Sequence, residues 1–213
     1  MTTNLFEDFD PISSKQWKQK IQFELKGADY NDTLIWNSPE DIKVKPFYNT
    51  DDCTETFEVH TQATQFKICQ NIFVYDIDKS IERALDTLAR GAESLRFTIE
   101  DSSTDIAKLL DPLPLETTPI YFYLHFISID FVKKIDAIAS KRNATIFCNL
   151  DPIGQLAQDG NWFTTAEKNN FETIKLLEKE TTAISLLSIN GTLYQNAGAT
   201  IVQQIAYILG HTN

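Results

Sequence analysis

The chain has 213 residues, a formal net charge of -11 at pH 7 and a hydrophobic share of 42% that includes 14 Phe, 7 Tyr and 3 Trp. This apolar content is enough for a packed core, and the length suggests one or two domains. An acidic surface repels phosphate backbones, so a nucleic-acid partner is not expected.

The sequence also argues against a membrane or secretory location. No apolar run approaches the roughly 20 residues that a spanning helix needs, and no basic amphipathic helix is present to lie on a bilayer. The first residues are polar and acidic, unlike a signal peptide. The three cysteines, Cys53, Cys69 and Cys148, are widely spaced and suit a reducing compartment. We therefore expect a cytoplasmic protein without a membrane partner.

Residues 1–65 are expected to form an N-terminal arm and linker. A turn at Asp10-Pro11 precedes an amphipathic helix, and Gly27 ends this helix. The residues that supply most of its apolar face are Trp17, Ile21, Phe23 and Leu25. Residues 33–36 then begin an alternating, extended segment that continues through Ile42, Val44 and Pro46 to Tyr48. Residues 49–65 are polar and acidic, so we interpret them as a surface arm or linker.

Residues 66–213 alternate between strand and helix patterns. Phe66–Tyr75 is expected to be extended, and Asp76 opens a helix that Gly91 closes. Four short strands should follow, separated by helical patterns: Leu95–Ile99, Ile120–Phe126, Thr145–Leu150 and Ala183–Ile189. The last three are almost continuously hydrophobic, which is typical of a sheet covered on both faces.

This alternation predicts an α/β fold with a parallel sheet. A TIM barrel needs about eight such units over ~250 residues. The chain has four units from Leu95 onward and ends at Asn213, where the next strand would begin. We therefore expect residues 66–213 to be a truncated, first half of a TIM-type barrel, from an expressed piece or a split gene. The alternative is a complete open sheet of four or five strands. In the half barrel, Leu95–Ile99 and Ala183–Ile189 would be unpaired edges, which predicts self-association.

Four segments together resemble the pattern of one known enzyme family. Residues 17–48 match W-x3-I…L-x-G…L-I-W-x-S-P-E-x-I-x-V-K-P-F-Y, similar to that family's N-terminal arm. Residues 88–95 resemble the L-x-x-G-A-x-x-L segment before the first barrel strand, and residues 149–154 resemble a later D-P-x-G element. Residues 194–207 resemble the signature Y-x-x-A-G-A-x-x-V-Q-E-L-A-x. Together these segments resemble the methylmalonyl-CoA mutase family. The resemblance covers nearly all of the chain and implies a helical arm followed by a TIM barrel.

The resemblance is to the small, non-catalytic subunit of that family. Catalytic subunits carry an active-site tyrosine in I-R-Q-Y-A-G, and the matching residues here are Ile68-Cys69-Gln70-Asn71-Ile72-Phe73. No D-x-H-x-x-G cobalamin-ligating motif is present; in the family it lies in a later domain. The resemblance therefore implies no catalytic, cofactor-binding or metal-binding residue in this chain. It implies adenosylcobalamin in the holoenzyme, and a catalytic large subunit as partner.

Bulky side chains on the expected strands also indicate a non-catalytic chain. In catalytic members of the family the CoA tail threads the barrel axis, which requires small inward side chains. Because side chains alternate along a strand, each strand here has two possible inward sets. The sets are Ile120/Phe122/Leu124/Phe126 or Tyr121/Tyr123/His125, Thr145/Phe147/Asn149 or Ile146/Cys148/Leu150, and Ile184/Leu186/Ser188 or Ser185/Leu187/Ile189. Every set contains a large residue, so a continuous channel should be blocked.

Few residues are candidates for chemistry of their own. His60, His125 and His211 are far apart, and none has a second ligand at metal spacing. His125 is either an active-site group at the end of a strand or a hydrogen-bonded core histidine. Cys148 is either a small core residue or a reactive thiol, and no histidine neighbours Cys69 in sequence.

Three further segments, which are acidic or contain glycine, each allow two interpretations. Asp151 is an active-site acid or a turn residue. The acidic run that contains Asp51, Asp52 and Glu55 binds a divalent cation or is a solvated arm. Gly198 begins the last helix with N–H groups free for a phosphate, or only allows tight packing.

Three functions follow from these observations. The first is a structural small subunit of adenosylcobalamin-dependent methylmalonyl-CoA mutase, which interconverts methylmalonyl-CoA and succinyl-CoA; this chain alone would be inactive. The second is a divergent but active acyl-CoA mutase chain. The third is a free-standing α/β module that binds a small anion.

Overall fold

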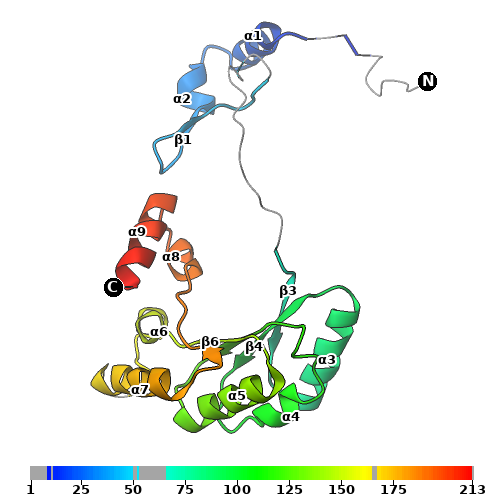
Figure 1. Ribbon diagram of the computed structural model, residues 1–213. Helices are drawn as coiled ribbons and strands as arrows, with labels where there is room; N and C mark the ends of the chain where they lie inside the picture. Colours follow the sequence, from blue (N-terminus) through cyan, green and yellow to red (C-terminus); the bar gives the residue numbers. More distant parts are fainter. Residues whose placement is uncertain (1–8, 11, 50–51, 53–65, 165–166, 213) are drawn as a thin grey trace, which may run out of the picture. The chain divides into compact units, whose positions relative to one another are not determined.

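The computed structural model describes residues 9–10, 12–49, 52, 66–164 and 167–212 (Figure 1). The chain divides into two compact units. One comprises Met1–Gln62 with Thr200–Val202, and the other Ala63–Ala199 with Gln203–Asn213. Residues 53–65 lie outside the described part, so the boundary at residue 65 stays a prediction. Within the described residues, no helix is both long and apolar enough to cross a bilayer.

The first unit contains two helices and a hairpin. Helix α1 (Ser14–Glu24) begins with a capping box, in which the Ser13 and Gln16 side chains each accept the other's backbone N–H. Helix α2 (Tyr30–Leu34) follows, and β1 (Trp36–Asn37) pairs antiparallel with β2 (Lys43–Val44). The expectation that residues 33–36 are extended is therefore wrong for the first two. They belong to α2 because the Asp29 carboxylate accepts N–H groups of its first turn.

This unit buries little of its apolar surface. Tyr30 is the one buried side chain among described residues 9–49 and 52. Trp17 packs edge-to-face on Phe47 with ring centroids 5.6 Å apart, yet it remains half exposed. Phe23, which was expected on the apolar face of α1, is 79% exposed. The unit therefore holds its shape mainly through caps and turns.

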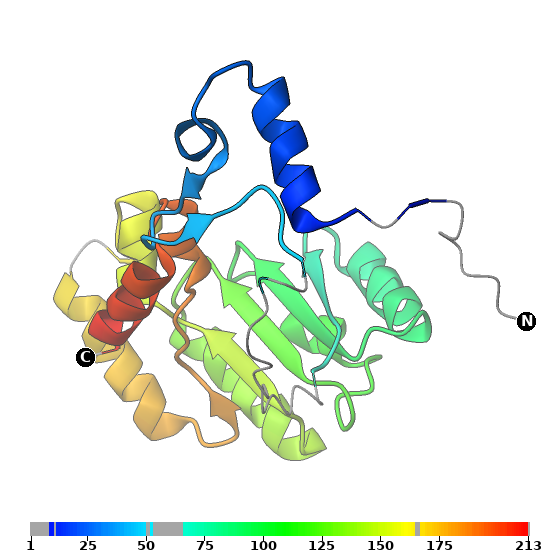
Figure 2. The same ribbon diagram turned by 90° about the horizontal axis from the view of Figure 1, so that it is seen from above.

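The second unit is built on a five-stranded parallel sheet. Its strands are β3 (Cys69–Phe73), β4 (Ser94–Ile99), β5 (Ile120–Leu124), β6 (Ile146–Asn149) and β7 (Ile184–Ser185). They pair in chain order, side by side, as Figure 2 shows. Chain-order pairing of parallel strands is the arrangement of a (β/α) barrel, whereas a doubly wound sheet reverses its order. The α/β class is confirmed, and the topology is consistent with part of a barrel.

Seven helices of the described residues connect or follow these strands: α3 (Ile77–Ala89), α4 (Ile106–Leu110), α5 (Ile129–Arg142), α6 (Pro152–Asp159), α7 (Glu167–Glu180), α8 (Thr192–Asn196) and α9 (Ile201–His211). Figure 1 shows α3, α4 and α5 on the same face of the sheet. The core lies between these helices and the strands. Its fully buried members include Phe97, Phe122 and Ile135.

Two expectations about the sheet are corrected. Leu95–Ile99 is not an edge, because β4 pairs on one side with β3 and on the other with β5; the edges of the described sheet are β3 and β7. The expected strand Ala183–Ile189 pairs only at Ile184–Ser185. The edge argument for self-association consequently rests on one five-residue strand and one two-residue strand.

The sheet is covered on one face, not on both as the hydrophobic runs suggest. Burial alternates along β5 and β6, so every second residue packs on the helices. The other face carries two rows in register: Arg96, Tyr121, Phe147 and Ser185, and then Thr98, Tyr123 and Asn149. The runs look continuously hydrophobic because aromatic residues occupy this second face.

Candidate functional site

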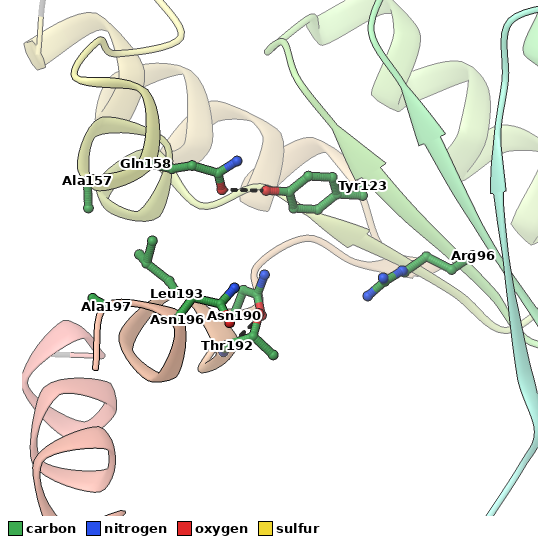
Figure 3. Close-up of a pocket in the computed structure, with 9 residues that line it drawn as sticks. All are labelled: Arg96, Tyr123, Ala157, Gln158, Asn190, Thr192, Leu193, Asn196 and Ala197. Carbon is green, nitrogen blue, oxygen red and sulfur yellow. Dashed lines mark hydrogen bonds between the residues drawn. The ribbon is translucent and has the colours of Figure 1, made fainter. Parts of the chain in front are cut away.

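The candidate site lies on this second face, toward the carboxyl ends of β5 and β6. Parallel α/β folds form their sites at this end of the strands. Arg96 projects from β4 and Tyr123 from β5, because both lie out of phase with the buried residues of their strands. Helix α6 follows β6, and the segment that leads from β7 into α8 supplies the opposite wall (Figure 3).

These elements enclose a cavity of about 530 Å³. Its walls are polar and apolar in about equal measure and carry one cation. The lining residues are Arg96, Tyr123, Ala157, Gln158, Asn190, Thr192, Leu193, Asn196 and Ala197. In Figure 3 the Arg96 guanidinium and the Tyr123 hydroxyl both point from the sheet toward the residues of α6 and α8.

Two hydrogen-bonded pairs fix the polar walls. The Tyr123 hydroxyl donates to Gln158 Oε1 at 3.1 Å. Asn190 Oδ1 accepts from the backbone N–H of Thr192 at 3.2 Å and from its hydroxyl at 2.6 Å. Burial raises the pKa of Tyr123, and the carboxylates of Asp159 and Asp151 raise it further. Tyr123 therefore stays a neutral phenol across the physiological range.

Arg96 is the unpaired charge of the site. Among the ion pairs of the described residues, none involves Arg96, and its side chain is exposed to the cavity. Arg90, the C-cap of α3, and Arg142 of α5 each bind a carboxylate by contrast. The cavity thus presents a guanidinium, a phenol and amide groups, which suits binding of a polar anion more than bond-breaking chemistry.

A second cluster lies beside this cavity. His211 Nε2 is 2.8 Å from Asp151 Oδ1, and His211 Nδ1 is 2.7 Å from the Tyr194 hydroxyl. The His211 side chain is only 4% exposed. Asp151 Oδ1 also accepts the backbone N–H of Gly154, as the N-cap of α6. The cluster ties the end of α9 to the start of α6.

The histidines and cysteines fall as follows. His125 is half-buried against the Tyr123 ring, with centroids 4.9 Å apart, and His60 lies outside the described residues. Cys148 is buried in the core, which raises the pKa of its thiol to about 12, as expected for a packing residue. Cys69 is exposed on β3.

The remaining candidates are also placed. Asp151 is the helix cap that the turn interpretation predicts. Asp52 binds Lys45 at 2.7 Å, while Asp51 and Glu55 lie outside the described residues. No group of three metal-ligating side chains comes together in the part of the chain that the structure describes.

The hypothesis that Gly198 begins the last helix and offers free N–H groups to a phosphate is wrong. Gly198 has φ +90° and its N–H donates to the carbonyl of Gln195, while Ala199 donates to that of Tyr194. These are the two bonds of a Schellman motif, so Gly198 ends α8 rather than beginning α9.

Sequence reasoning missed the two groupings that matter most. Arg96 and Asn190 are 94 positions apart, and the His211–Asp151 pair spans 60. No local sequence motif predicts either pair. For Arg96, the alternation of polar and apolar residues along β4 was the available signal. A lone arginine among apolar strand residues must face a polar environment.

Parallel βα units in chain order, with a cavity near their carboxyl ends, define an α/β protein whose topology is consistent with part of a (β/α) barrel. No protein-family model matches the chain. Over an alignment of 236 residues it is 25% identical to the methylmalonyl-CoA mutase small subunit of Porphyromonas gingivalis (strain ATCC BAA-308 / W83). The alignment covers 96% of this chain, which spans 37% of the relative's length. The resemblance to that family, and to its small subunit, is confirmed.

Proposed function

We propose that this chain functions as part of a small subunit of adenosylcobalamin-dependent methylmalonyl-CoA mutase in the cytoplasm, where it binds and stabilises a catalytic large subunit. The observation that carries the proposal is the similarity to a mutase small subunit over 96% of the chain. The holoenzyme would interconvert methylmalonyl-CoA and succinyl-CoA, with the radical chemistry supplied by its cofactor.

The first unit supports a role in assembly. Its described residues bury one side chain and leave large apolar groups in solvent, among them Trp36 at 61% and Phe23 at 79% exposure. Aromatic residues are enriched in protein interfaces, and clustered exposed apolar groups mark binding surfaces. Interface contacts would supply the burial that this unit lacks.

The sheet supports a non-catalytic role. The segment Ile68–Phe73, which matches the catalytic I-R-Q-Y-A-G, forms the edge strand β3 without its arginine and tyrosine. Burial fixes which residues occupy the open face, and they include Tyr121, Tyr123 and Phe147. In a closed barrel these rings would project toward the axis, where a CoA tail would need small side chains.

His211, whose side chain is buried, is not available as a ligand for the cobalt of adenosylcobalamin. Both ring nitrogens of His211 are held, one by Asp151 and one by Tyr194. Together with the missing D-x-H-x-x-G sequence, this supports the proposal that the chain itself binds no adenosylcobalamin.

Co-purification with the cognate large subunit tests the proposal. The large subunit would be identified by its I-R-Q-Y-A-G and D-x-H-x-x-G motifs, and the chain would carry the affinity tag. We expect a stoichiometric complex, with no conversion of methylmalonyl-CoA by the chain alone. Failure to capture the large subunit would overturn the proposal. Turnover by the isolated chain would instead support a divergent active mutase.

A further inference from the structure

Several hydrogen-bond donors converge on the cavity at Arg96. We propose that it is a binding site for a small monocarboxylate anion, a function independent of assembly with a large subunit. The carboxylate would bind between the Arg96 guanidinium and the side-chain amide of Asn190, and the remainder of the ligand would extend into the cavity (Figure 3).

The orientation of Asn190 is set by its partner. A backbone N–H can only donate, so the Asn190 atom that faces Thr192 N at 3.2 Å must be the oxygen. The Asn190 NH2 group is consequently left as a donor, and no described residue accepts from it. A cavity-facing amide with its oxygen already bound can offer a ligand only hydrogen atoms.

Gln158 and Arg96 contribute further donors to the cavity. Gln158 Oε1 already accepts the Tyr123 hydroxyl, so the Gln158 NH2 group remains as a donor. Arg96 has donors alone and no carboxylate partner among the described residues. Three sources of N–H groups therefore surround one space, and the ligand that satisfies them must be an acceptor.

The charge balance selects a monoanion. Arg96 is the one cation that lines the cavity. The carboxylates of Asp151 and Asp159 are near enough to raise the pKa of Tyr123, and the whole chain has a net charge of -11. A doubly charged phosphate would be repelled by this surplus, whereas a carboxylate matches one guanidinium in both charge and planar geometry.

An adjoining cavity of about 190 Å³ shows where the apolar part of a ligand fits. Arg96 and Asn190 line both cavities. The second one also includes Tyr121 and Phe147, whose rings stack 4.8 Å apart at 9°. A carboxylate held at Arg96 thus has an aromatic surface beside it, which suits a short acyl or aryl group.

Titration of the isotopically labelled 213-residue chain tests the site by NMR. The probes are sodium acetate, lactate, benzoate and phosphate, at constant ionic strength kept with chloride. The signals to follow are the Arg96 Nε–H and the side-chain NH2 groups of Asn190 and Gln158. We expect saturable shifts of these signals with the monocarboxylates, and weaker ones with phosphate.

Two variants and one control make the test specific. Arg96→Gln removes the cation, and Asn190→Asp keeps the oxygen that Thr192 needs but replaces the donor with a charge. Each should weaken carboxylate binding roughly ten-fold or more. Arg83→Gln, which removes an exposed arginine from α3, should change the affinity less than two-fold.

The outcomes separate the alternatives. Saturable binding that is lost in both site variants, but kept in the control, supports the monocarboxylate site. Phosphate binding tighter than carboxylate binding would overturn the charge argument. Shifts that are equal in the wild-type chain and Arg96→Gln would overturn the site itself. None of these results depends on a large subunit, so they leave the proposed assembly role untouched.

Discussion

Replacement of Trp36 by alanine should separate assembly from folding. Trp36 lies on β1 and is 61% exposed. A covered tryptophan buries up to about 250 Å², so covering this exposed part would remove ~150 Å² from water. At ~25 cal/mol per Å² that area corresponds to about 4 kcal/mol as an upper limit. We expect W36A to weaken binding of the large subunit by about 2–4 kcal/mol, or roughly 30- to 1,000-fold.

Surface plasmon resonance with an immobilised large subunit measures this change directly. The matched control is Tyr75→Ala, which deletes another exposed aromatic ring, 93% exposed, from the second unit. It should bind as the unaltered chain does. Circular dichroism should show the same melting of the second unit in both variants. If W36A binds the large subunit normally, the first unit is not the assembly surface and the interface reasoning fails.

Three further predictions concern the second unit. Arg142 binds both oxygens of Glu116 and also three backbone carbonyls of the segment before β5, so R142Q should lower the urea midpoint more than E116Q does; equal shifts would show that the exposed ion pair is what matters. His211→Ala leaves a tyrosine and an aspartate without their shared partner, and should cost about 1–3 kcal/mol with faster amide exchange in α9; unchanged exchange would contradict this. Because burial raises the pKa of the Cys148 thiol to about 12, about one thiol in 10⁴ is ionised at pH 8. Iodoacetamide should therefore modify exposed Cys69 and spare Cys148 until urea is added, as peptide mass spectrometry would report.

The strand and helix pattern of the second unit could be predicted because its periodicity is strong. Asp76 caps α3 and Asp151 caps α6, and both caps are readable from local sequence. What could not be predicted is which face of each strand meets the helices. Tyr121 and Phe147 are as apolar as their buried neighbours, so composition alone made the two faces look alike.

The site was less accessible to prediction than the fold. Asn190 becomes informative only once Thr192 is seen to occupy its oxygen, which is a matter of rotamer and loop geometry. The pairing of His211 with Asp151 depends on where α9 packs, and no spacing rule encodes that contact. In the first unit, residues 33 and 34 stand at the start of a strand-like segment, but the cap at Asp29 outweighs that pattern and they lie in α2.

The sequential order of the sheet has a consequence for synthesis on the ribosome. Each strand from β4 to β7 pairs with the strand that immediately precedes it in the chain. When a βα unit is translated, the strand with which it pairs has therefore already been synthesised. In a reversed or Greek-key order, by contrast, some strands pair only with segments that are translated later. Addition of units at rates of about 5–20 residues per second would let the sheet lengthen stepwise as the chain emerges. During that growth one edge of the sheet remains β3 and the other is the newest strand, and two-residue β7 offers other chains very little backbone to pair with.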